Sequence, residues 1–437
     1  MSIDLTPHRE RVAQSHPVGR YGRVTDVVGL TVAVIGPPLS VGSCCWLEPR
    51  GGGERVAAEV VGFREGRTLL MPLGSMHGIG PGSLVIPSWL PQRVRVGNGV
   101  LGRVLDARGQ TIDGGPPPDW EEEVPLLAPP PAPLTRRRIR EPIATGVRAI
   151  DMCTTLGKGQ RVGIMSGSGV GKSKLLGMIA RNTSADINVI ALIGERGREV
   201  REFIENDLGP EGLARSVVVV ATSDEPALRR INGAYLATAV AEWFRGRGAD
   251  VMLMMDSVTR FAMAQREVGL AVGEPPATRG YPPSVFALLP QLLERAGTSA
   301  HGSITGIYAV LVEGDDLNDP VGDAVRSILD GHVALSRDLA SRGHYPPVDV
   351  LDSVSRTMTD VTRDEHRALA AKLRGVLSTY REAEDLVNIG AYVAGSNPEI
   401  DEALRVMPKV RRFLRQGLQE NTPFADLERL VEGALRA

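Results

Sequence analysis

Continuous apolar runs alternate with amphipathic stretches from about residue 146 to residue 361. The runs are rich in Val, Ile, Leu and Met and occupy residues 160–165, 187–194, 216–222, 250–256 and 302–312. Strands that are buried on both faces of a parallel sheet have this composition. The stretches between them, such as residues 225–246, have helical periodicity. The pattern therefore predicts a doubly wound α/β domain.

Shorter β-type runs precede this region, between residues 21 and 88. Glycine and proline separate the runs, which cover residues 23–36, 43–48, 56–63, 67–74 and 82–88. Short strands at this spacing indicate a small β-barrel. After about residue 362 helical periodicity takes over, with Asn397 as the expected N-cap and Pro398 at the first helical position. The tail is therefore predicted to be a small helical domain.

These patterns divide the chain into a short N-terminal segment (1–18), a β-barrel (19–91), an α/β domain (92–361) and a helical domain (362–437). Residues 113–142, inside the α/β part, are rich in proline and end in a basic run, Arg136–Arg140. Polyproline character predicts a semi-rigid connector. We expect the basic run to be solvated rather than bound to an acidic partner.

Composition narrows the function classes. Of 437 residues, 42% are hydrophobic and 23% charged, and the net charge is −2, which provides no basic field for nucleic acid. The barrel also lacks an aromatic platform for bases, so no nucleic-acid partner is expected. No apolar run approaches the roughly 18–20 residues of a membrane span, and the N-terminus has no signal-peptide core. We therefore expect a cytoplasmic protein whose three cysteines are buried apolar residues.

A phosphate-binding loop follows the run at residues 160–165 and precedes a predicted helix that starts near Lys172. Backbone N–H groups in such a loop point at phosphate oxygens, and the helix dipole adds to them. We expect Lys172 to reach the β- and γ-phosphates of ATP and the Ser173 hydroxyl to coordinate Mg²⁺. Ser166 replaces the usual first glycine, at a junction where a small side chain suffices. The candidate nucleotide-binding residues of the loop are Ser166, Gly167, Ser168, Gly169, Val170, Gly171, Lys172 and Ser173.

Two carboxylates complete the candidate chemistry. Asp256 ends the apolar run at 250–256, the usual place for a carboxylate that holds the Mg²⁺ shell, and Glu195 follows the run at 187–194. The carboxyl ends of parallel strands face the nucleotide. Glu195 is thus a candidate for the group that polarises the attacking water. The alternative for Glu195 is an acidic residue at the start of a surface helix. From residue patterns alone, the segment HYPPVDVLDSVSR at 344–356 is predicted to be a loop with a solvated arginine.

Several long segments resemble one family. They read GERGREV, DSVTRFAMAQREVGLAVGEPPATRGYPPSVFALLPQLLERAG, VLVEGDDLNDPVGDAVRSILDGHVALSR and YPPVDVLDSVSR. They resemble the catalytic subunits of rotary ATPases, and most of all the ATPases of the flagellar type III protein-export apparatus. Part of the second segment, GEPPATRGYPPSVF, and one additional stretch, YREAEDLVNIGAYVAGSNPEID, favour the flagellar branch over the virulence branch. The resemblance begins near Gly19 and continues to the C-terminus.

The resemblance implies a P-loop (RecA-like) ATPase core between an N-terminal β-barrel and a C-terminal helical domain. It also implies roles for single residues. Glu195 matches the catalytic glutamate, Arg196 helps to sense the γ-phosphate, Arg356 matches the arginine finger that reaches a neighbour's site, and Tyr345 matches the residue that stacks on adenine. Phe424 matches a second adenine-side aromatic less well, and we predict that it packs in the core. Lys174 stands where threonine is expected and adds a charge beside the Mg²⁺ ligand.

The resemblance also implies partners. These are further copies of the chain in a homohexamer, a stator-like regulator, a central-stalk protein, export chaperone–substrate complexes and the export gate. It places the protein in the cytoplasm, with peripheral contact to the inner membrane. The expected function is an ATP-hydrolysing motor that releases or unfolds export substrates. The alternatives are a virulence-type secretion ATPase, a rotary synthase or pump subunit, a ring translocase on RNA, and a regulatory nucleotide-binding subunit without catalysis.

Overall fold

The computed structural model describes residues 20–36, 38–88, 92–312 and 319–436, so the predicted segment at 1–18 lies outside the described residues. The chain forms two compact units. One contains the residues up to Gln92 together with Ala271–Gly273. The other contains Arg93–Leu270 and the residues from Glu274 onward. No helix within the described ranges is long and apolar enough to cross a lipid bilayer.

The first unit is the predicted β-barrel. Its strands close in the order β1-β2-β5-β4-β3-β6, and β1 pairs with β6 to complete the circle. Inward-facing Val24, Val32, Leu47, Val60 and Leu70 fill its core. This alternation of buried and exposed positions is what a small closed barrel requires. The strands are β1 (Gly22–Val28), β2 (Thr31–Ile35), β3 (Cys44–Glu48), β4 (Val56–Arg64), β5 (Arg67–Pro72) and β6 (Leu84–Pro87).

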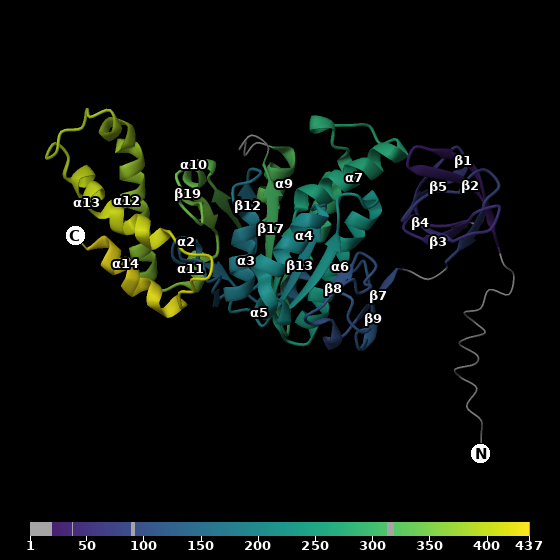
Figure 1. Ribbon diagram of the computed structural model, residues 1–437, viewed down its shortest axis with the longest axis horizontal. Helices are drawn as coiled ribbons and strands as arrows, with labels where there is room; N and C mark the ends of the chain where they lie inside the picture. Colours follow the sequence, from purple (N-terminus) through teal and green to yellow (C-terminus); the bar gives the residue numbers. More distant parts are fainter. Residues whose placement is uncertain (1–19, 37, 89–91, 313–318, 437) are drawn as a thin grey trace, which may run out of the picture. The chain divides into compact units, whose positions relative to one another are not determined.

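The second unit is built on a nine-stranded sheet in the order β19-β18-β12-β17-β15-β13-β14-β8, with β16 added beside β17 (Figure 1). All neighbours are parallel except β19 on β18 and β16 on β17. The five apolar runs predicted as strands are all present. The strands are β8 (Val104–Asp106), β12 (Arg161–Ser166), β13 (Ile187–Ile193), β14 (Ser216–Ala221), β15 (Asp250–Asp256), β16 (Gly297–Thr298), β17 (Ser303–Leu311), β18 (Gly331–Leu335) and β19 (Val348–Ser355).

Helices cover this sheet, and the predicted helix within 225–246 is α6 (Ala227–Gly246), which packs on β13, β14 and β15. The remaining helices of this part are short or of medium length. They are α2 (Arg148–Cys153), α3 (Lys172–Asn182), α4 (Gly197–Glu202), the π-helix η3 (Phe203–Leu208), α5 (Gly209–Ala214), α7 (Val258–Val272), α8 (Pro283–Leu293), α9 (Pro320–Ile328), α10 (Arg337–Ser341) and α11 (Met358–Val361), with 3₁₀ turns at η1 (Asn98–Val100), η2 (Pro133–Thr135) and η4 (Thr278–Gly280).

The C-terminal helices are α12 (Asp364–Asn388), α13 (Pro398–Leu414) and α14 (Leu427–Leu435), with a 3₁₀ turn, η6 (Phe424–Asp426), before the last (Figure 1). The predicted cap of α13 is confirmed, because the Asn397 side chain accepts hydrogen bonds from the N–H groups of Glu399 and Ile400, and Pro398 opens the helix. The three helices pack on one another and on α2. Their buried side chains belong to the same core as those of α2 and α3.

The proline-rich connector at 113–142 is attached more firmly than its sequence indicates. It contains β9 (Glu122–Pro125), which pairs with β7 (Arg93–Val96), and it precedes a second small pair, β10 (Pro142–Ile143) with β11 (Leu156–Gly157). The prediction that the basic run is solvated is wrong for Arg136, whose guanidinium donates to the carbonyl oxygens of Glu294 and Ala296. Arg137 likewise donates to the carbonyls of Ser299 and His301. These acceptors lie more than 150 residues further along the chain, so the run alone could not show them.

Candidate functional site

The phosphate-binding loop lies between β12 and α3, as the sequence predicts. Ser166 ends β12, and α3 begins at Lys172 with Gly171 as its N-cap. Gly169 and Gly171 have φ angles of +76° and +107°, in the region that side-chain-bearing residues rarely adopt. Gly167 does not share this conformation. The two left-handed glycines turn the chain tightly, so that the first N–H groups of α3 face the space above the strand.

Ser166 occupies the strand-to-loop junction. Its residue is 2% exposed, and its carbonyl oxygen accepts a hydrogen bond from Val312 N at 3.0 Å. The Ser166 hydroxyl is buried and has no hydrogen-bond partner within the described part of the chain. The backbone carbonyl of Ser166 thus joins the start of the loop to the residue after β17, and the buried hydroxyl adds a small desolvation cost.

Lys172 lies between two carboxylates at the carboxyl ends of neighbouring strands. Asp256 ends β15, Glu195 follows β13, and the parallel register that pairs Leu192 with Asp256 brings the two strand ends to one edge of the sheet. The ammonium group of Lys172 donates to Asp256 Oδ1 and lies 3.6 Å from Glu195 Oε1. The structure therefore brings together three of the predicted site residues, from three separate elements.

Glu195 is set up for proton transfer near neutral pH. Burial, followed by the nearby charge of Asp256, raises the pKa of its carboxyl to about 7, and the charge of Lys172 opposes the shift. A general base works best when its pKa lies near the operating pH. The geometry does not favour the alternative of a surface acid, because the Glu195 carboxyl is largely buried beside Lys172.

Two neighbours of Lys172 on α3 differ in their surroundings. Ser173 is exposed in the first turn of the helix. Lys174 points away from the loop, and its ammonium lies 2.8 Å from Asp207 Oδ1 and 3.5 Å from Glu202 Oε1. The prediction that Lys174 adds a charge beside the Mg²⁺ ligand is therefore wrong, since two acidic residues of α4 and η3 neutralise it.

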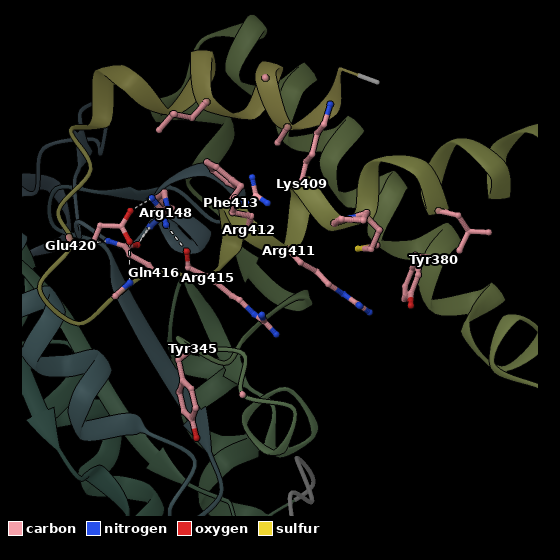
Figure 2. A pocket seen from close by; sticks show the side chains of 18 residues that line it. Arg148, Tyr345, Tyr380, Lys409, Arg411, Arg412, Phe413, Arg415, Gln416 and Glu420 are labelled. Carbon is pink, nitrogen blue, oxygen red and sulfur yellow. Dashed lines mark hydrogen bonds and ion pairs between the residues drawn. The ribbon is translucent and has the colours of Figure 1, made fainter.

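Tyr345 lies beside the loop. A Cβ atom placed on Gly171 would be 3.6 Å from Cε1 of its ring. The residue is 48% exposed, and Figure 2 shows its ring at the lower end of a cavity of about 1260 Å³ whose other wall is α13 and the residues that follow it. An exposed aromatic ring next to the start of α3 is placed as a base-stacking platform would be.

Two predicted arginines lie apart from this cluster. The Arg196 side chain is 78% exposed and pairs loosely with Glu199, at 3.8 Å. Arg356 is exposed and follows β19, so the segment predicted to be a loop is an edge strand. Because β19 runs antiparallel to β18, Arg356 lies at the end of the sheet opposite the loop, where its N–H donates to Asp330 O. One chain does not bring Arg356 to its own Lys172.

Arg260, which was not predicted from the sequence as a site residue, lies on α7, four residues after Asp256. A Cβ atom on Gly194 would lie 2.8 Å from Arg260 Cβ, so this arginine adjoins the turn that carries Glu195. Its Nε is buried without a hydrogen-bond partner within the described ranges. The available signal was its place in the first turn of the helix that follows Asp256. The core prediction for Phe424 is confirmed, because its ring stacks on His366, with ring centres 5.8 Å apart.

Three family models match this chain. The nucleotide-binding domain of the ATP synthase alpha/beta family matches residues 146–355, and the β-barrel domain of the same family matches residues 24–88. The C-terminal domain of the type III secretion ATPase EscN matches residues 362–431. The matched ranges fall on the nucleotide-binding part, the β-barrel and the C-terminal helices, respectively.

Relatives that match over most of the chain carry names of the same kind as these families. The chain is 56% identical to a flagellum-specific ATP synthase of Bacillus subtilis (92% of each chain) and 50% identical to that of Salmonella typhimurium (94% of this chain, 92% of the relative). It is 52% identical to a type 3 secretion system ATPase of Xanthomonas euvesicatoria (93% and 92%). The solved structure of assembled EscN from enteropathogenic E. coli superposes with a TM-score of 0.90 at 43% identity, covering 95% of this chain and all of that one. A complex of EscN with its central stalk EscO gives 0.87 at 42%, with the same coverage.

Proposed function

Because the chain belongs to the ATP synthase alpha/beta family, in the group of flagellum-specific ATP synthases and type III secretion ATPases, we propose that it hydrolyses Mg-ATP at sites shared between neighbouring copies of a homohexameric ring. The chain is an ATPase of the flagellar protein-export type.

The residues of the loop fit a Mg-nucleotide. Two left-handed glycines leave the N–H groups of the loop free to face phosphate oxygens, and the space around Gly169 is open to a distance of 4 Å. Ser173 would supply a hydroxyl ligand and Asp256 a carboxylate for the hydrated shell, which are the oxygen donors that Mg²⁺ prefers. Mg²⁺ held there would neutralise charge on the β- and γ-phosphates. Tyr345 would stack on the adenine.

Glu195 is assigned as the general base. Its carboxylate takes a proton from water as the water oxygen attacks the γ-phosphorus and the bond to the ADP oxygen breaks, which yields ADP and phosphate. Lys172, which lies beside Glu195, stabilises the negative charge on the transferred group. Arg260, whose buried Nε has no hydrogen-bond partner among the described residues, is the second cation beside the turn at Gly194. Arg196 is assigned to sensing the γ-phosphate from its exposed position.

Arg356 would act in a neighbouring copy. It is exposed, it follows an edge strand, and it lies at the end of the sheet away from its own loop. In a closed ring each interface is identical and heterologous, so one face supplies the loop and the other supplies the guanidinium. An arginine finger of this kind contributes about 10³–10⁵ in rate.

The proposed partners follow from the relatives. EscN is described with a central stalk, EscO, and we assign a comparable stalk protein to this chain, bound by the helical domain formed by α12, α13 and α14. A stator-like regulator, export chaperone–substrate complexes, the export gate and the inner-membrane surface complete the proposed set. The virulence-type assignment is the second candidate, because one such relative is 52% identical.

The observation that carries the proposal is the placement of Lys172 between Glu195 and Asp256 at the mouth of the loop. The test is a chromosomal Lys172→Ala strain compared with Lys174→Ala, a matched change on the same helix whose side chain points away. We expect Lys172→Ala to abolish ATP turnover and to remove flagellin and hook proteins from the medium. Loss of a different set of secreted proteins would favour the virulence-type function. Normal secretion by the Lys172→Ala strain would refute the proposal.

A further inference from the structure

Gln416 lies at the joint between the C-terminal helices and the nucleotide-binding part. It is two residues past the end of α13 and is only 4% exposed. Its backbone N–H donates to Tyr345 O at 2.9 Å. Its side chain accepts from Arg148 N at 2.9 Å and donates to Gly146 O at 2.7 Å and to Glu420 O at 2.8 Å.

The side chain of Gln416 has no donor left for a ligand. An amide group carries two N–H donors, and both are used by carbonyl oxygens of the protein. Gln416 is therefore placed to hold other residues in position, and not to contact a base itself. The residues it joins belong to three segments: the start of α2, the turn before β19 that carries Tyr345, and the loop before α14.

Arg148 reinforces this joint from the α2 side. Its guanidinium donates to Glu420 and to the carbonyl of Arg415 (Figure 2). It also donates to Thr422 Oγ1 at 3.4 Å. Residues before and after Gln416, namely Arg415 and Glu420, are thus both hydrogen-bonded to Arg148 of α2. Tyr345, by contrast, is half exposed, so packing restrains its ring less than that of a core residue. The hydrogen bond from Gln416 N to the Tyr345 carbonyl oxygen therefore contributes more to fixing the position of Tyr345.

We propose that Gln416 is a positioning residue for the base platform: it holds Tyr345 in place and thereby couples the location of the C-terminal helices to the affinity for the adenine end of the nucleotide. This inference rests on the assignment of Tyr345 as the base platform in the proposed function. A shift of α13 relative to α2 would strain the hydrogen bonds of Gln416 and move Tyr345. Binding of the base would in turn favour the arrangement in which these bonds are formed, because coupling between two sites is reciprocal.

The test compares two ligands that share the phosphate site and differ in the base. Gln416→Met removes the three side-chain hydrogen bonds at similar volume, and Gln419→Met, at an exposed position of the same loop, is the matched control. MgADP and Mg-tripolyphosphate are titrated into the full-length proteins. We expect Gln416→Met to weaken MgADP about tenfold and to leave tripolyphosphate within about twofold. KM for ATP should rise with kcat nearly unchanged, because the phosphate cradle is intact.

Two results would overturn the inference. Equal weakening of both ligands would mean a general structural role, and unchanged MgADP affinity would mean that Gln416 does not act on the base. Tyr345→Ala separates this from a failure of the proposed function: if Tyr345→Ala weakens MgADP and Gln416→Met does not, only the inference fails. If Tyr345→Ala has no effect, the platform assignment itself is wrong. Should Gln416→Met not fold, Gln416→Asn, one methylene shorter, carries the same expectation.

Discussion

Replacing Arg356 with alanine removes an exposed guanidinium that cannot reach the phosphate-binding loop of its own chain. Ser355 pairs with Gly331, and His332 pairs with Gly163, so Arg356 lies at the level of Arg161 on β12. Asp330 bonds to both segments, accepting from Arg356 N and donating to Arg161 O. The loop starts after Ser166, five strand residues further, which is a separation of about 16 Å at the ordinary rise of a strand.

We therefore expect Arg356→Ala to reduce ATP turnover by about 10³–10⁵, the usual contribution of an arginine finger. MgADP affinity should change little, because the loop and Tyr345 are intact. Steady-state phosphate release measures the first quantity and equilibrium titration the second. Arg405→Ala, an exposed position on α13, is the control for loss of a surface arginine.

Mixing two inactive proteins decides whether the site is shared. A Lys172→Ala chain retains Arg356, and an Arg356→Ala chain retains Lys172. In randomly mixed rings, about a quarter of the interfaces combine an intact loop with an intact arginine, so up to about a quarter of the turnover should return. If a single chain held the complete site, no mixture would recover any activity. The absence of recovery in rings proven to be mixed would refute the reasoning from the register.

Three further changes test other parts of the site and the fold. Glu195→Gln should abolish turnover while ADP still binds. The Glu195 carboxylate must be deprotonated to act as a base, and its pKa is raised to about 7. In a pH–rate profile, wild-type kcat should therefore fall as the pH drops below 7 and level off above it, and Glu195→Gln should show no activity at any pH. Arg295→Met should lower the free energy of unfolding by about 3–5 kcal/mol in denaturant titrations, because buried Arg295 pairs with Glu242 at 2.6 Å and donates a hydrogen bond to Leu126 O. Adding Glu242→Leu to this variant should recover much of the lost stability, because it removes the carboxylate left without Arg295. Ser166→Ala should leave turnover unchanged and the free energy of unfolding equal or slightly higher, because the Ser166 hydroxyl is buried without a partner in the described part of the chain. A drop in turnover would mean that the hydroxyl has a catalytic use.

The parts of the fold that local patterns encode could be predicted from the sequence. The five buried strands of the parallel sheet, the start of α3 at Lys172 and the cap at Asn397 each depend on composition or spacing within a few residues. Glu195 and Asp256 could be assigned to one edge because parallel strands end together.

The other features depend on partners that are distant in the chain. The prolines before β19 concealed a strand whose pairing partner is β18. The acceptors of Arg136 are backbone carbonyls, and because every residue has one, the sequence does not indicate which of them a side chain will contact. Lys174 looked like a charge in the nucleotide site because its partner Asp207 lies more than 30 residues away, in a π-helix that no periodicity indicated. Gln416 was missed for the same reason, since it bonds to a segment 270 residues earlier.

By these assignments, the base and the γ-phosphate of the nucleotide would contact different parts of the ring. Tyr345 would hold the base, and through Gln416 it is bonded to the C-terminal helices of the same chain. The γ-phosphate would meet Lys172 of that chain and Arg356 of the neighbouring one. Cleavage removes the γ-phosphate contact but leaves the base in place, so hydrolysis would first loosen the contact between subunits. The C-terminal helices would be released only when ADP leaves, which orders the two movements within one cycle without requiring a separate switch.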